Sequence, residues 1–304
     1  MTTPIILDVD TGVDDAVAIA LALADPEIEL VACTTLAGNI DVINATNNTL
    51  NVLDFLGASQ VPVYQGASRP LARPLFMADY FHGTDGLGES NLPKSTRGPG
   101  EYRGPAAMIR YATERPGEIT LVCVGPLTNL AIALNVFPRL PEKVAGVVVM
   151  GGAYHVPGNT RPWAEFNIFC DPESAGQVFE AAPQFKRFVA VGLDVSLHVA
   201  VSRAGYDAAG SHPGKVAELL RQVGRRSFEE RQITEFHLHD PLAVAVAAAP
   251  EIIRTERSEV VVDTNEEHRG RTRVIGPGAV EIARSVDREV FLSRFHDILD
   301  LPQG

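Results

Sequence analysis

The sequence has few cysteines and no long apolar run, and each absence excludes a class of protein. Only three cysteines occur, Cys33, Cys123 and Cys170, and an odd number does not complete a disulfide framework. No apolar run approaches the length of a membrane span, and the N-terminus lacks the basic start and apolar core of a signal peptide. We therefore expect reduced cysteines, no membrane partner and a cytoplasmic location.

A surplus of basic residues is also absent. Lys and Arg number 26 against 38 Asp and Glu, which gives a formal net charge of -12. Proteins that bind nucleic-acid phosphates display a basic patch, so this balance argues against a nucleic-acid partner. A small or neutral substrate fits better, and grouped carboxylates are compatible with a bound cation.

Apolar residues are plentiful and are spread along the whole chain. They form 45% of the 304 residues, enough for a sizeable packed core. A large α/β sheet with helices on both faces can accommodate this length as one unit. Since no internal repeat, low-complexity tract or clear linker is present, we expect residues 1–304 to form a single domain.

Short β-rich runs alternate with segments of helical period, the pattern of βαβ units in a parallel sheet. Strands are expected at 4–10, 27–36, 119–125, 145–152 and 188–195, and helices at 14–24, 41–57 and 127–135. Three late runs, 258–264, 272–276 and 279–286, precede a final helix from Asp287 to Leu299. The sequence predicts a Rossmann-like α/β fold with a mostly parallel central sheet flanked by helices and a small antiparallel addition near the C-terminus.

Two long irregular stretches interrupt this pattern. Residues from about Phe76 to Arg103 form a Gly/Pro-rich connection well beyond the usual loop length, which indicates a functional lid or a flexible insert. The second stretch runs from Gly151 to Asp171, and the chain beyond Ser211 has a helical pattern. Parallel sheets bind ligands at the carboxyl ends of their strands, so polar residues at those ends are the first site candidates.

Four carboxylates converge where the first strand gives way to the first helix: Asp8, Asp10, Asp14 and Asp15. Capping of the helix N-terminus is one interpretation, because free N–H groups there favour negative charge. Four like charges this close repel one another unless a cation intervenes, and a hard metal bound through oxygen relieves that repulsion. Consecutive helical residues point about 100° apart. We therefore expect Asp14 and Asp15 to divide between substrate and metal.

A second polar group, Asn159, Glu165 and Asn167, comes from the irregular stretch around Pro157 and Pro162. If the chain is extended there, Glu165 and Asn167 face the same way and Phe166 turns aside. The polarity of an ordinary surface loop is the alternative interpretation.

The segment DVDTGVDDAVAIALAL at 8–23 resembles the N-terminal signature of the inosine-uridine preferring nucleoside hydrolases. The similarity continues through six further segments along nearly the whole chain. They are TTLAGN at 34–39, HGTDGLG at 82–88, VGPLTNLA at 124–131, VVMGGA at 148–153, AEFNIFCDPESA at 164–175 and HDPLA at 239–243. The resemblance implies an enzyme that hydrolyses the N-glycosidic bond of ribonucleosides to ribose and free nucleobase in a calcium-dependent reaction.

That resemblance also implies a metal site. A calcium ion would be held by the carboxylates of Asp10, Asp15 and Asp240 and by the main-chain carbonyl of Val124. Calcium takes roughly six to eight oxygen ligands, so positions are left for the attacking water and for ribose hydroxyls. The metal would lower the pKa of that water, and Asp10 would take its proton as general base.

The substrate site implied by the same resemblance has a sugar end and a base end. Its expected residues are Asp14, Asn39, His82, Met150, Asn159, Glu165, Phe166 and Asn167. As the glycosidic bond stretches, the sugar becomes oxocarbenium-like, and hydrogen bonds that strengthen in that state lower the barrier.

The leaving base needs a proton donor or other stabilisation. The resemblance places His82 and His239 at the base end, and His239 is the stronger candidate because it adjoins the expected metal ligand Asp240. His155, His198 and His237 are the histidines most easily mistaken for it.

Base specificity in the family depends on the loop after the third strand and on the region before HDPLA, here residues 225–236, for which we expect a helix. Ser227 and Arg231 stand where purine or pyrimidine specialists are expected to carry aromatic or amide side chains. The preferred base is therefore left open, while the family implies a homodimer or homotetramer.

Two alternatives compete with a nucleoside hydrolase. The string ILDVDT also resembles the first motif of haloacid-dehalogenase-like phosphatases, but that leaves Asp14, Asp15 and HDPLA without a role. A non-catalytic nucleoside-binding protein would keep the metal and ribose contacts, yet it would lack the base or the acid that Asp10 and His239 supply.

Overall fold

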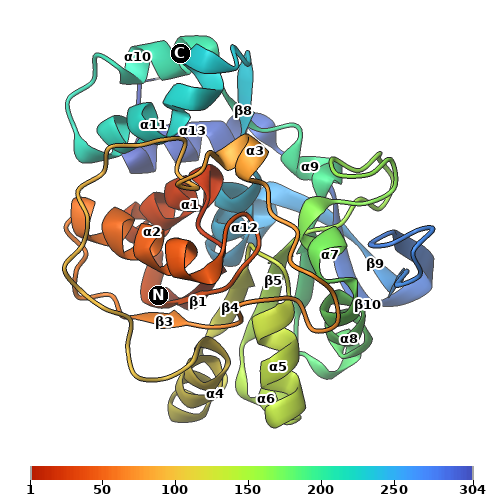
Figure 1. The fold of residues 1–304 in the computed structure, drawn as a ribbon. Helices are drawn as coiled ribbons and strands as arrows, with labels where there is room; N and C mark the ends of the chain where they lie inside the picture. Colours follow the sequence, from red (N-terminus) through yellow and green to blue (C-terminus); the bar gives the residue numbers. More distant parts are fainter. Residues whose placement is uncertain (1, 303–304) are drawn as a thin grey trace.

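A computed structural model describes residues 2–302. Eight strands form one sheet in the order β3-β2-β1-β4-β5-β6-β10-β9, parallel throughout except that β9 runs antiparallel to β10 (Figure 1). The strands are β1 (Thr3–Val9), β2 (Ile28–Thr35), β3 (Val63–Gln65), β4 (Thr120–Cys123), β5 (Gly146–Met150), β6 (Phe188–Val191), β9 (Ile253–Val262) and β10 (Thr272–Val286). A separate antiparallel pair joins β7 (Ala200–Ser202) to β8 (Glu235–His237).

Helices cover both faces of the sheet, and each face has its own apolar core. One face packs against α1 (Val13–Ala24), α2 (Val42–Phe55), α11 (Lys215–Arg225), α12 (His239–Ala248) and α13 (Arg288–Leu299). The other packs against α4 (Gly104–Glu114), α5 (Thr128–Val136), α6 (Leu140–Lys143) and α8 (Pro172–Glu180). The shorter helices are α3 (Asp79–His82), α7 (Phe166–Cys170), α9 (Leu193–Ser196) and α10 (Arg203–Ala209). The predicted fold class is confirmed.

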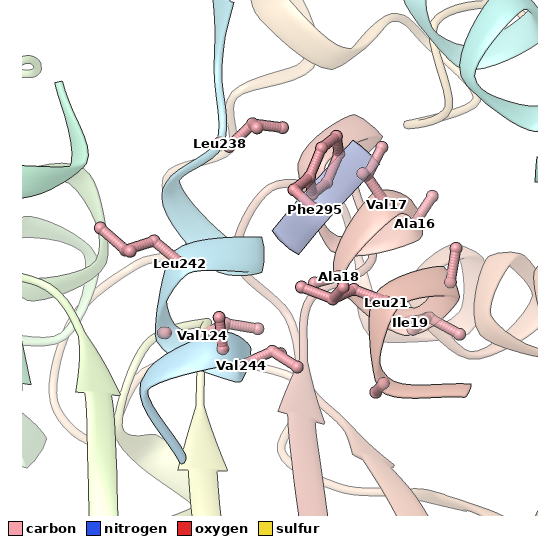
Figure 2. Packing of buried hydrophobic residues seen from close by; sticks show 14 of the residues in the cluster. Ala16, Val17, Ala18, Ile19, Leu21, Val124, Leu238, Leu242, Val244 and Phe295 are labelled. Carbon is pink, nitrogen blue, oxygen red and sulfur yellow. The ribbon is translucent and has the colours of Figure 1, made fainter. Parts of the chain in front are cut away.

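Helix α1 is buried on nearly every side. Its residues from Ala16 to Ala22 are all buried, which is typical of a helix that is apolar all round and lies in the interior. Figure 2 shows Phe295 of α13 beside Val17 of α1, and both belong to one apolar core with Leu242 and Val244 of α12. Because α1 is enclosed, the carboxylates in its first turn have fixed positions.

Four local predictions are wrong. The strand expected at 188–195 ends at Val191, and residues 193–195 belong to helix α9. Residues 272–276 and 279–286 belong to one strand, β10, because its pairing with β9 continues past irregularities around Gly276. The stretch 151–171 is not irregular to its end, since α7 occupies Phe166–Cys170. Residues 225–236 are not one helix: a π-helical turn, Arg226–Glu230, is followed by β8. Helix α7 forms because a side chain caps its start, and β8 forms because it pairs with the distant strand β7.

The strand order places a crevice beside β1. The chain runs from β1 outward to β2 and β3, then returns to the other side of β1 for β4, β5 and β6. In open α/β sheets, ligands bind outside the carboxyl ends of the strands at such a reversal. Here that point lies between the ends of β1 and β4, next to Asp10 and Val124. Among residues 2–302, no helix combines the length and apolar character needed to cross a lipid bilayer.

Candidate active site

A cavity of about 460 Å³ opens at the carboxyl ends of the strands. Most of the predicted site residues line it: Asp14, Asn39, His82, Val124, Met150, Asn159, Glu165, Phe166, Asn167, His239 and Asp240. Asp10 and Asp15 do not line it, and both are fully buried. A larger groove of about 590 Å³ runs beside α8, β9 and β10, but its lining holds no histidine.

Asp10 is held tightly directly after β1. The Asn39 N–H donates to Asp10 Oδ2 over 2.6 Å, and the Asp10 N–H donates to Asp15 Oδ1 over 3.2 Å. Glycines enclose the carboxylate: a Cβ on Gly38 would collide with Oδ2, and one on Gly125 would lie 2.8 Å from Oδ1. Oδ1 is buried and has no hydrogen-bond partner among the described residues. Such an orphaned carboxylate oxygen is normally satisfied by an ion or a water.

Asp14, Asp15 and Asp240 form a compact group whose ligand oxygens all lie within 4.8 Å of one another. Burial, reinforced by the neighbouring carboxylates, raises the pKa of Asp14 to about 7 and that of Asp240 well above its usual range. Burial also raises the pKa of Asp15 to about 6, although the Gly12 N–H opposes this by donating to Oδ2 over 2.8 Å. Carboxylates that resist ionisation together are stabilised by a shared cation.

These oxygens fit a hard cation. The donor set is all oxygen, and the buried Oδ1 of Asp10 lacks a partner among residues 2–302. The Val124 N–H donates to the Asp8 carbonyl over 2.9 Å, whereas its carbonyl accepts the Asn167 side chain over 2.7 Å and is free of the strand ladder. The compact group includes Asp14, which we predicted for the sugar, and does not include Asp10.

Asp8, near the end of β1, supports the turn that carries Asp10. Its Oδ1 accepts the Thr34 hydroxyl over 2.6 Å and the Asn129 amide over 2.7 Å, while Oδ2 has no partner in the described chain. Burial raises the pKa of Asp8 to about 7. The supporting position expected for Asp8 agrees with this geometry, but Asn129 was not predicted, since a lone asparagine on a helix gives no signal.

Glu165 and Asn167 lie together, but the chain between them is not extended as expected. Glu165 caps α7: its carboxylate accepts the backbone N–H groups of Asn167 and Ile168 over 2.8 and 3.1 Å. The Gly152 N–H donates to the same carboxylate over 3.1 Å. Asn167 therefore starts a helix, and its amide reaches the carbonyls of Val124 and Met150.

Asn159 and Phe166 form the outer side of this wall. The side-chain oxygen of the exposed Asn159 accepts the Phe166 N–H over 2.9 Å. The Phe166 ring is buried against Phe76, with 6.2 Å between ring centroids. Asn159 and Phe166 both line the cavity, so the Phe166 ring is not turned away from it as we expected.

The two predicted histidines also line the cavity. Val13 N–H donates to His82 Nδ1 over 3.1 Å, and a Cβ on Gly12 would collide with that ring. His239 Nδ1 lies 2.8 Å from the Ser196 hydroxyl. Burial lowers the pKa of each imidazole to about 3, with Arg231 contributing at His82 and His237 at His239. Both rings are therefore neutral near pH 7.

The cavity is also lined by residues that were not predicted as site residues, among them Tyr80, Phe81, Leu197, Glu235 and His237. His237 lines the cavity with His239, whereas His155 and His198 do not. Arg231 lies over the Phe81 ring, 4.6 Å from its centroid. Ser227 is buried outside the lining, so it does not face a ligand there. Two signals in the sequence indicate these residues: the adjacency of Tyr80 and Phe81 to the His82 motif, and the expected base-specificity region 225–236, which contains Arg231 and Glu235.

Comparisons with known proteins identify the family of this chain. A family model described as "Inosine-uridine preferring nucleoside hydrolase" matches residues 5–293. The chain is 36% identical over 274 residues to a probable uridine nucleosidase of Arabidopsis thaliana, covering 88% of this chain and 84% of that protein. It is 38% identical over 271 residues to an inosine-uridine preferring nucleoside hydrolase of Leishmania major, with 87% and 85% covered.

A solved structure described as a plant nucleoside hydrolase has the same fold. It superposes with a TM-score of 0.93 at 33% identity, covering 99% of this chain and all of that one (100%). The chain belongs to the inosine-uridine preferring nucleoside hydrolase family, whose members are enzymes that hydrolyse nucleosides.

Proposed function

We propose that this enzyme hydrolyses ribonucleosides to ribose and free base with calcium as its metal and Asp10 as its general base. The observation that carries the proposal is the buried Oδ1 of Asp10, which has no protein partner in the described chain and lies beside the other first-turn carboxylates. A base needs a lone pair that no other group uses. Glycine at 38 and 125 keeps the carboxylate in place.

The metal would be held by Asp10, Asp15, Asp240 and the carbonyl of Val124, and Asp14 is close enough to Asp15 and Asp240 to take part. When bound, a calcium ion neutralises these carboxylates and lowers the pKa of the attacking water. Asp10 then takes a proton from that water.

Asp14, Asn159, Glu165 and Asn167 would bind the ribose hydroxyls, with Asn39 nearby. Glu165 and Asn167 suit this role because backbone and side-chain hydrogen bonds fix both of them. Fixed donors and acceptors cost no reorganisation as the sugar approaches an oxocarbenium ion. Met150 and Phe166 close the apolar sides of the same space.

His239 would donate a hydrogen bond to the leaving base, with His82 beside the same part of the cavity. Since both rings are neutral, each stabilises the developing negative charge as an N–H donor.

A nucleoside panel tests the proposal. Purified enzyme is incubated with uridine, cytidine, inosine and adenosine, with and without a chelator, and ribose release is followed. We expect ribose from at least one nucleoside, loss of activity with chelator, and recovery on adding Ca²⁺ in excess. Recovery with Mg²⁺ or Mn²⁺ but not with Ca²⁺ would contradict the choice of metal, and activity that a chelator leaves intact would contradict metal dependence.

Family membership decides against the phosphatase and the non-catalytic alternatives. The relatives described as uridine and inosine-uridine hydrolases support uridine and inosine as first substrates. A homodimer or homotetramer and a cytoplasmic location are further parts of the proposal. Light scattering after size exclusion measures the first, and fractionation of the source cells measures the second.

A further inference from the structure

His239 has a partner that the proposed reaction does not use. Its Nδ1 lies 2.8 Å from the hydroxyl of Ser196, the last residue of α9. Ser196 is completely buried, and its own N–H donates to the Gly192 carbonyl over 3.1 Å. The serine is therefore fixed by its helix, and its hydroxyl has little freedom except rotation about the Cβ–Oγ bond.

The hydrogen-bond pattern selects the direction of this contact. A serine hydroxyl has one proton to donate, and a buried one that donates to nothing is costly. In the described part of the chain, Nδ1 of His239 is the single hydrogen-bond partner of the Ser196 hydroxyl. The hydroxyl therefore donates and Nδ1 accepts, which leaves the ring proton on Nε2.

His82 offers an internal comparison, because its Nδ1 accepts a hydrogen bond whose direction is fixed by the donor. A backbone N–H only donates, so the bond from Val13 requires an unprotonated Nδ1 and places the proton of His82 on Nε2. In both histidines, His82 of α3 and His239 of α12, Nδ1 is therefore the ring nitrogen that is bonded to the protein, which leaves Nε2 for a ligand in the cavity.

We infer that Ser196 is a positioning residue for the leaving-group step: its hydroxyl fixes the orientation and the Nε2–H tautomer of His239, so that this ring presents an N–H donor to the departing base. The inference rests on the proposed role of His239. Loss of the hydroxyl would remove the partner that holds Nδ1 without a proton and fixes the ring plane, so the ring could turn or carry its proton on Nδ1 and offer the base an acceptor in place of a donor.

A kinetic comparison tests the inference. Ser196→Ala should lower kcat for uridine and inosine on the order of 10- to 100-fold, part of the loss that His239→Ala gives, with little change in KM. Ser196→Thr, which keeps the hydroxyl, should restore most of kcat. Ser258→Ala removes an equally buried hydroxyl from β9, outside the cavity lining, and should leave kcat unchanged.

A substrate with a better leaving group separates positioning from general damage. The phenolate of 4-nitrophenyl β-D-ribofuranoside departs without a proton, so Ser196→Ala should lose at least ten times less activity on it than on uridine. Equal losses on both substrates would mean that Ser196 only maintains the fold of the site and would overturn the inference. Wild-type enzyme that released ribose from neither substrate would instead contradict the proposed function.

Nitrogen-15 NMR of the histidine side chains gives a readout that does not depend on activity or on how well a variant folds. In the wild type, with His239→Gln used for assignment, His239 should show an unprotonated Nδ1 and a protonated Nε2, as should His82. A protonated Nδ1 on His239 would overturn the inference even if Ser196→Ala were inactive. Ser196→Ala should populate both tautomers at His239 and leave His82 unchanged.

Discussion

The two ends of the cavity are built differently. At the sugar end, Asp10, Glu165 and Asn167 follow strands or begin helices, are buried, and are each held by backbone hydrogen bonds. At the base end, Tyr80 is 58% exposed, and Arg231 is exposed and held over Phe81 through a ring contact. In the proposed assignment, the first arrangement would position groups for bond breaking, whereas the second would surround whichever base is attached.

This difference follows from the fold. Carboxyl ends of strands are fixed by the ladder on both sides, and their first helical residues are fixed by capping. Surface connections have fewer buried contacts and tolerate substitution, which is why they carry specificity. The chemistry should therefore be sensitive to small changes at the sugar end, and base preference should be adjustable at the rim.

The largest effect is expected from the sugar itself. Replacing uridine by 2′-deoxyuridine should lower kcat/KM on the order of 10⁴-fold, because a buried site that hydrogen-bonds a hydroxyl leaves its own groups unpaired when the hydroxyl is absent. Steady-state kinetics on the two nucleosides measure the ratio. Comparable rates would show that the sugar end is no more selective than the rim.

Asp10→Asn should lower kcat about 10²- to 10⁴-fold, since the amide keeps the shape of the carboxylate but accepts no proton. Ribose release measures the rate, and near-ultraviolet circular dichroism checks that the fold is retained. Asp41→Asn, at the N-cap of α2, is the matched control, because asparagine also caps helices, and it should leave kcat unchanged. An active Asp10→Asn enzyme would remove Asp10 from the role of base.

Asn129→Leu tests the support beneath the sugar end. It removes donors to the Asp8 carboxylate and the Thr35 carbonyl, so the free energy of unfolding should fall by about 1–3 kcal/mol. Asn135→Leu, on the exposed side of the same helix, should change it by less than about 0.5 kcal/mol. Urea denaturation measures both, and equal effects would mean that the buried network adds nothing.

Arg231→Gln should have the smallest effect on stability and a modest one on substrate choice. The guanidinium offers only hydrogen-bond donors. Its loss should lower the ratio of kcat/KM for uridine over cytidine by about 10-fold, which is the effect expected from losing one hydrogen bond to a charged group. The unfolding free energy should change by less than about 0.5 kcal/mol. Arg110→Gln, which removes a similar contact over Tyr102 outside the cavity, should leave the ratio unchanged.

The same contrast explains how much the sequence alone predicts. Apolar strands followed by polar residues locate the sheet and the turn around Asp10, because burial and local sequence act together there. Helix α7 could not be predicted from local sequence, because its start depends on capping by the Glu165 carboxylate after a stretch containing Pro157 and Pro162. Strand β8 exists through its pairing with β7, and Arg231 meets Phe81 across 150 residues of chain, so neither contact has a local signal.

The bond from Val13 N–H to His82 Nδ1 bears on how this scaffold can vary. It anchors the entrance of the long connection to the start of α1, and the absence of a side chain at Gly12 gives the imidazole its place. Beyond this anchor the connection is held to α2, where the Ser95 N–H donates to Asn51 Oδ1 over 2.7 Å and Arg97 pairs with Asp54 over 2.7 Å. None of residues 83–103 lines the cavity, so substitutions in that segment should leave the cavity wall unchanged as long as His82 keeps its anchor.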